Sequence, residues 1–192
     1  MIRYIFLDGE MGGRDLKFSL LTSSFIVTDE TFNELGRLHL NVKPDDGAYL
    51  LTGTGMGVNK IDIAHHDKIA ISYNNAKGIL YDFLKSMTQN YKFKLVPVGH
   101  AVKGDIEFVH KYLLSTGSWF QACTYHYIDT SCLLQFLRAC GKMPIDIDGS
   151  VSAMASYFGV LNESDHSKLH DSMFDAEMTC KVYQKMLELG KN

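Results

Sequence analysis

The chain has 192 residues, with 22 acidic and 19 basic side chains and a formal net charge of −3. A chain of this length can bury roughly 70% of the surface that its unfolded form exposes, so we expect one domain over residues 1–192. The negative charge argues against a protein that grips long nucleic acid by its backbone, because that binding needs many lysine and arginine contacts.

The sequence has no segment typical of export or membrane insertion. Its N-terminus enters an apolar pattern without the basic region and cleavage site of a signal peptide, and no apolar run approaches the ~20 residues that span a bilayer. The four cysteines form no Cys-x-x-Cys pair, so neither a zinc site nor a disulfide framework is indicated. We therefore expect a cytoplasmic protein with no membrane partner.

The N-terminal part of the chain predicts three β-strands, at residues 3–8, 17–28 and 33–42. The connections between them are rich in turn-forming residues and too short for crossover helices. The three strands should therefore form an antiparallel meander.

In the next two segments, residues 61–66 and 74–88, the spacing of the apolar residues predicts helices. A buried strand ending in Gly-His at 94–100, a helix from Asp105 and a strand at 124–128 come next, and three helical segments complete the chain. This alternation predicts an α/β fold with a five-stranded mixed sheet and flanking helices.

Two carboxylates, Asp8 and Glu10, stand two residues apart at the end of the first strand. The two-residue period of a strand aims both side chains at one face. They repel each other unless a divalent cation lies between them, and hard cations such as magnesium or manganese favour oxygen ligands. An Asp-x-Glu triplet alone arises by chance about once in a chain or two of this length, so its meaning depends on what accompanies it.

Further polar positions follow in a fixed order: Asp105 at the start of a helical pattern, then His170 and Asp175 near the C-terminus. The set Asp-x-Glu, Asp, His-x-x-x-x-Asp resembles that of the DEDDh exonucleases, which include the proofreading subunit of bacterial replicative polymerase, oligoribonuclease and ribonuclease T. The resemblance runs from residue 3 to residue 189. Secondary markers agree with it, namely Asp-Thr at 129–130 and Asp-Ala-Glu-x-Thr at 175–179.

The sequence also departs from the pattern of that family. Ala101 and Gly104 stand where the second motif usually has Asn and Phe, which leaves the acidic Asp105 in place but alters the packing surface beside it. Met11 follows Glu10 as in oligoribonuclease-like members. Ser172 replaces a small alanine, a change that we expect to be tolerated.

The resemblance implies a ribonuclease H-like fold and a 3′–5′ exonuclease that hydrolyses phosphodiester bonds at single-stranded DNA or RNA 3′ ends, releasing nucleoside 5′-monophosphates. Asp8, Glu10, Asp105 and Asp175 would hold two divalent cations, Mg²⁺ or Mn²⁺. His170, on the loop that enters the last helix, would take the proton from water. A negative net charge is compatible with such an enzyme, because it holds few nucleotides and its metals supply positive charge.

Three residues lie where a terminal base and sugar could pack: Phe6, Met11 and Gly12. For Phe6, packing in the core is an equal alternative. Five lysines could form a basic track beside the site or belong to an ordinary solvated surface, namely Lys92, Lys94, Lys103, Lys111 and Lys168.

Other motifs receive structural interpretations. The glycine-rich segment 53–60 fits neither common phosphate-binding pattern, so we expect a flexible loop at the rim of the cleft. His65 and His66 should lie at the surface or at a helix start, and His100 should be a structural histidine bonded to backbone. Asp171 should cap the last helix.

A different class of function remains open: a catalytically silent nucleic-acid-binding or scaffold module on the same fold. Retention of all five polar positions argues against it, because four converging carboxylates repel phosphate when no metal is bound. The sequence does not decide between DNA, RNA and short oligonucleotides as substrate, nor between a single chain and a homodimer.

Overall fold

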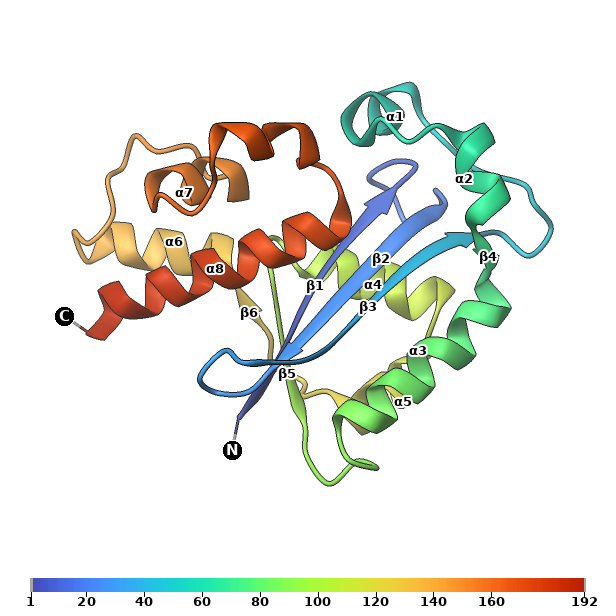
Figure 1. Cartoon of the computed structure of the whole chain (residues 1–192), viewed down its shortest axis with the longest axis horizontal. Coiled ribbons are helices and arrows are strands. Elements are labelled where there is room, and N and C mark those ends of the chain that lie inside the picture. Colours follow the sequence, from blue (N-terminus) through green and yellow to red (C-terminus); the bar gives the residue numbers. More distant parts are fainter. Residues whose placement is uncertain (1, 192) are drawn as a thin grey trace.

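A single twisted sheet runs through the computed structural model, which describes residues 2–191 apart from the side chain of Glu163 (Figure 1). The strand order is β4-β3-β2-β1-β5-β6. The strands are β1 (Arg3–Met11), β2 (Leu20–Thr28), β3 (Glu34–Lys43), β4 (Ile71–Ser72), β5 (Leu95–Gly99) and β6 (Ile128–Asp129). β1, β2 and β3 pair antiparallel, which confirms the predicted meander, and β5 lies parallel to β1.

The sheet has six strands and not the predicted five. The additional strand, β4, is only two residues long and pairs with Val42 and Lys43 at the edge of the sheet. A segment this short carries no alternation that a sequence pattern could reveal. The last strand is also shorter than expected, since it begins at Ile128.

Eight α-helices and one 3₁₀ helix are present among the described residues. They are α1 (Gly53–Asn59), α2 (Ile63–Ile69), α3 (Tyr73–Met87), α4 (Lys103–Tyr112), α5 (Thr116–Ala122), α6 (Thr130–Ala139), α7 (Val151–Tyr157), η1 (Glu163–Lys168) and α8 (Ser172–Lys191). None of these helices is long and apolar enough to cross a bilayer. The cytoplasmic location stays a prediction.

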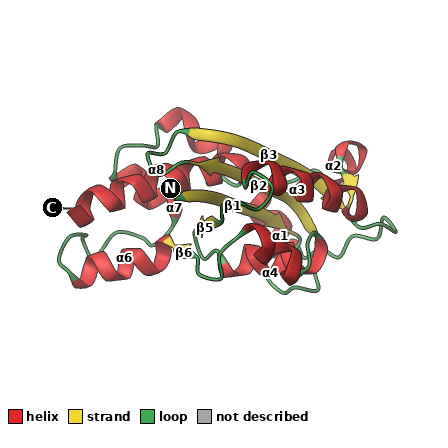
Figure 2. Cartoon of the chain, turned by 90° about the horizontal axis from the view of Figure 1, so that it is seen from below, coloured by secondary structure: helices red, strands yellow, loops and turns green. Residues whose placement is uncertain are grey.

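The two faces of β1 contact different helices. Ile5 and Leu7 belong to a core shared with α3, α4 and α5, whereas Phe6 packs with residues of α8. Figure 2 shows the strands between α8 and α4. Because alternate residues of a strand face opposite sides, Asp8 and Glu10 share the face of Phe6 and lie toward α8. β1 is thereby held from both sides at the centre of the sheet.

The segment at 53–60, expected to be a loop, forms helix α1. Thr52 caps its start by accepting a hydrogen bond from the Gly55 amide, and Lys60 ends it in a left-handed conformation with φ 56°. Its last helical residue, Asn59, donates from Nδ2 to the Met11 carbonyl at 3.1 Å. The hydrogen bond from the Gly55 amide to the Thr52 cap stabilises the helix and so offsets the low helix propensity of its glycines.

Gly12 joins the end of β1 to the segment that precedes α1. Its carbonyl accepts hydrogen bonds from the amide and the hydroxyl of Thr52, at 2.7 and 2.9 Å. A Cβ atom at Gly12 would lie 2.6 Å from the Leu50 carbonyl oxygen, which is too close for a contact with backbone. The absence of a side chain at Gly12 is therefore a condition for this docking.

We predict that Gly12→Ala lowers the free energy of unfolding by about 1–3 kcal/mol, because the backbone of the 50–59 segment must shift. Gly53→Ala is the matched control, since a Cβ there meets nothing within 4 Å and the change should stay below about 1 kcal/mol. Urea unfolding of both variants measures the difference. Equal effects would contradict the docking role of Gly12.

Candidate active site

Three separate segments bring four carboxylates to the C-terminal half of β1. Asp8 and Glu10 come from β1 itself, Asp105 from the first turn of α4, and Asp175 from the first turn of α8. This placement on the central strand and two flanking helices is the one that the sequence predicted. Asp105 Oδ1 lies 3.4 Å from where a Cβ on Gly9 would be, so the glycine leaves room for the carboxylate.

Burial and mutual repulsion hold protons on this cluster. Burial raises the pKa of Asp8 well above its usual range, and the nearby carboxylates of Asp105, Asp175 and Glu10 raise it further. The same causes, burial first, raise the pKa of Glu10 to about 8. Burial raises the pKa of Asp105 to about 8 and that of Asp175 to about 6. Such a set of oxygen donors fits hard divalent cations, which would replace the protons.

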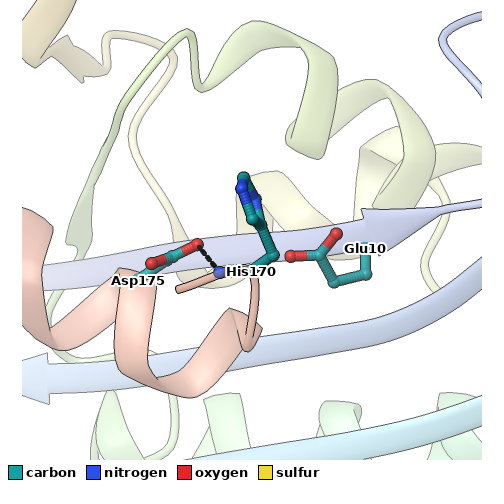
Figure 3. Close-up of side chains that lie close together, drawn as sticks. All are labelled: Glu10, His170 and Asp175. Carbon is teal, nitrogen blue, oxygen red and sulfur yellow. Dashed lines mark hydrogen bonds between the residues drawn. The ribbon is translucent and has the colours of Figure 1, made fainter. Parts of the chain in front are cut away.

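Three of the site residues offer ligand atoms that all lie within 4.8 Å of one another: Glu10, His170 and Asp175 (Figure 3). His170 has a left-handed backbone, with φ 70°, and its amide donates to Asp175 Oδ2 at 3.1 Å. This turn places the imidazole beside both carboxylates. We expected Asp8 to share one ion with Glu10 and Asp175, but the third member of this close group is His170. Asp8 still belongs to the cluster, because the other three carboxylates raise its pKa.

The first turn of α8 is fixed by two kinds of hydrogen bond. Asp171 Oδ1 accepts from the amides of Met173 and Phe174, so the predicted cap is confirmed. The buried Ser172 hydroxyl lies 2.8 Å from that of Thr22 and 2.7 Å from that of Ser24.

The hydroxyl network continues on both sides. Ser24 Oγ lies 2.8 Å from Nδ1 of His39, and Thr22 Oγ1 accepts from the Glu10 amide. We expected Ser172 only to be a tolerated replacement, so this connection between α8 and β2 was not predicted. The run of hydroxyl residues Thr22, Ser23 and Ser24 within β2 was the available signal.

Two clefts meet at Glu10. The first, of about 830 Å³, is lined by Asp8, Met11, Phe18, Asp105 and Phe108 among others. The second, of about 810 Å³, is lined by histidines and lysines that include His65, His166, His170, Lys60 and Lys168. The first is the more apolar of the two and therefore suits a nucleoside. Asp8 and Asp105 line the first cleft, and Glu10 lines both.

The three expected substrate contacts have different positions. Met11 lines the first cleft, whereas Gly12 lines neither and serves in docking. Phe6 is 0% exposed and packs with Ala176, Cys180 and Tyr183. For Phe6 the structure therefore shows the core alternative, and its ring is not accessible to a nucleotide.

His100 belongs to the wall of the first cleft. Its Nδ1 lies 3.0 Å from the Thr130 hydroxyl, which itself donates to the Gly99 carbonyl, so the expected bond to backbone is wrong. Burial lowers the pKa of His100, which favours the neutral ring. The expected marker Asp129 accepts from the Ala101 amide at 3.0 Å and so positions the loop before α4.

The adjacent histidines of α2 differ from each other. His65 is exposed at the second cleft, as expected, but His66 is buried, and its Nε2 lies 3.0 Å from the Val42 carbonyl. His66 is therefore not at the surface, but it lies three residues after the start of α2, near the other expected position. Neither residue belongs to a metal-binding group among the described residues.

Comparison with solved structures gives the fold. The chain superimposes on exonuclease I from Methylocaldum szegediense, a moderately thermophilic enzyme, with a TM-score of 0.72, 16% identity and 98% of this chain covered. Escherichia coli exonuclease I in complex with a dT13 oligonucleotide gives a TM-score of 0.69 at 19% identity over 97% of this chain. The zinc-bound complex of the same enzyme with single-stranded DNA gives 0.70 at 18% identity.

These matches confirm the predicted ribonuclease H-like fold and, at the level of fold, the resemblance to DEDDh exonucleases. The chain spans about two fifths of the length of these structures, since 41% of the first two is covered. No protein-family profile and no curated protein matches the sequence.

We predict that the metal-free protein becomes less stable as the pH rises from about 4 to about 8. The unfolded carboxyls ionise near 3.8 and 4.5, whereas the folded Glu10 and Asp105 keep their protons to about pH 8. A carboxyl group whose pKa is higher in the folded than in the unfolded protein stabilises the fold at a pH below the unfolded pKa. This stabilisation is lost as the pH rises from the unfolded to the folded pKa. Thermal melts in chelator should show the fall, and Mg²⁺ or Mn²⁺ should reverse it.

Glu10→Gln should flatten the melting profile, because it removes one titrating member of the cluster. Glu188→Gln is the control, as Glu188 is exposed at the end of α8 and should leave the profile unchanged. A profile in chelator that rises toward pH 8 would contradict the buried, protonated cluster.

Proposed function

We propose that the protein is a metal-dependent 3′–5′ exonuclease that shortens single-stranded nucleic acid and releases nucleoside 5′-monophosphates. The observation that carries this proposal is the convergence of Asp8, Glu10, Asp105, Asp175 and His170 on the C-terminal half of β1, beside the two clefts that Glu10 lines. The fold of exonuclease I supports it, and the E. coli enzyme of that fold has been crystallised with single-stranded DNA.

The four carboxylates would hold two divalent cations, Mg²⁺ or Mn²⁺. Bound there, the cations would make water a stronger acid and neutralise charge on the phosphate. Their donor set fits, because it is made of carboxylate oxygens, buried in Glu10 and half-buried in the other three, whose repulsion a cation removes. We assign Asp8, Glu10 and Asp175 to one ion and Asp8 with Asp105 to the other.

The remaining groups of the site bind the strand and move the proton. The first cleft would hold the terminal nucleoside against Met11 and Phe108. His170 would accept the proton of the attacking water, for which an imidazole on the cleft wall beside Glu10 and Asp175 is suitably placed. Asp105 lies on the α4 side, where we expect the leaving 3′-oxygen and the rest of the strand.

An end-labelled assay tests the proposal. With Mg²⁺ or Mn²⁺, a 5′-labelled single-stranded oligonucleotide should shorten as a ladder, and a 3′-phosphate should block the reaction because the terminal pocket holds a free hydroxyl. Chelator should abolish activity. Asp8→Asn should remove turnover, and Asp146→Asn, an exposed acid, serves as control. Comparable cleavage of circular single strands would refute an exonuclease, and metal-independent binding without cleavage would favour the silent module.

We predict that His170→Asn lowers kcat by roughly 10²–10⁴, the usual contribution of a general base. Asparagine tolerates the left-handed backbone, so the amide bond to Asp175 is kept. His65→Asn is the control, because His65 is an exposed histidine of the same cleft. Single-turnover rates at saturating Mn²⁺ give the comparison.

Two results would contradict the role of His170. If the His170 variant loses Mn²⁺ affinity and regains full rate at higher Mn²⁺, then His170 is a ligand and not a base. If His100→Asn removes turnover in a folded protein while His170→Asn is silent, the base lies in the second motif.

A further inference from the structure

A third, smaller cavity of about 200 Å³ lies between α4, β5, α5 and the segment that leads into β6. We call it the aromatic pocket, because four aromatic side chains line it: Trp119, Phe120, Tyr125 and Tyr127. It shares no lining residue with the two clefts of the active site.

Two of these aromatic side chains are open to solvent. Tyr125 is 75% exposed and Tyr127 is 43% exposed. The rings of Phe120 and Tyr125 are 4.2 Å apart between centroids and inclined by 31°, so they form a short platform. The exposed ring of Tyr125, supported by the half-buried Phe120 beside a cavity of this size, is suited to stack on a flat ring.

The polar groups of the pocket fit a nucleotide better than a purely apolar ligand. Lys103 is 71% exposed in its side chain, and its ion pair with Glu107 is long, at 3.7 Å, so the ammonium can approach a phosphate. His110 Nε2 is buried without a hydrogen-bond partner among the described residues, and burial lowers the pKa of this imidazole. A nucleobase carries donors and acceptors on its edge that could satisfy it.

The aromatic pocket adjoins the α4 rim of the first cleft. Lys103 and Ile106, which line the pocket, flank Asp105 in the sequence of α4. Tyr127 is two residues from Asp129, a span of at most ~7 Å, and the Asp129 carboxylate bonds to the Ala101 amide in the wall of that cleft. A strand that leaves the cleft over the start of α4 therefore reaches this pocket next.

We propose that the aromatic pocket binds a nucleobase of the single-stranded substrate on the 5′ side of the cut, by stacking on Tyr125 and Tyr127. This inference rests on the proposed function, because it places the rest of the strand on the Asp105 side. Stacking uses the faces of the bases and is tolerant of sequence and sugar. The subsite should consequently serve DNA and RNA alike and favour strands longer than a dinucleotide.

The test compares strand lengths. Labelled oligo(dT) and oligo(U), from dinucleotides to about ten nucleotides, are titrated by fluorescence anisotropy in Ca²⁺, and kcat/KM is measured in Mn²⁺. For the double variant Tyr125→Ala/Tyr127→Ala we expect a loss of roughly tenfold or more in affinity for the longest strands, since stacking contributes about 1–3 kcal/mol per base. Dinucleotide turnover should not change.

Two controls accompany the double variant. Tyr125→Phe keeps the ring and should bind as the wild type does, whereas Tyr157→Ala removes a comparably exposed tyrosine from α7 and should be silent. An equal loss at every length, or no loss for long strands, would overturn the subsite. If the wild type cleaves nothing while the two tyrosines still determine long-strand affinity, the hydrolytic function fails and the subsite stands.

Discussion

Repulsion among the four carboxylates of the cluster, of which Glu10 is buried and the other three are half-buried, is the constraint that shapes this protein. Asp8 interacts with all the others, and burial makes their ionisation costly until a cation replaces the protons. A stable domain would gain from losing such a cluster, because replacing like charges by neutral groups relieves the repulsion. Its presence on the central strand is the reason why we propose metal-dependent chemistry at this place.

The surrounding structure can be understood as a frame for that cluster. β1 is held between α8 and α4, and each helix supplies one carboxylate from its first turn. The Ser172 hydroxyl, bonded to Thr22 and Ser24, fixes the start of α8 against β2. The docking of Thr52 on Gly12 in turn fixes the far wall of the first cleft. Each contact limits how far the carboxylates can move apart.

Much of this arrangement could be predicted from the sequence, because it follows from local patterns. The short, turn-rich connections predicted the meander, and the ordered set of acids with His170, through its resemblance to a known family, predicted which side chains form the candidate site. What escaped prediction depends on contacts between distant segments. Segment 53–60 became a helix through the Thr52 cap, β4 formed only by pairing with β3, and the bond between Ser172 and Thr22 joins residues 150 positions apart. Phe6 had the right face for the site, but α8 covers it.

Direct titration with Mn²⁺ at about pH 7.5 tests the central claim most closely. Calorimetry in buffers of different ionisation enthalpy gives both the stoichiometry and the protons released. We expect two ions per chain with release of protons from Glu10 and Asp105, whose pKa values are raised to about 8, and loss of this binding in Asp8→Asn. Absence of Mn²⁺ binding, or binding that Asp8→Asn leaves intact without proton release, would contradict it.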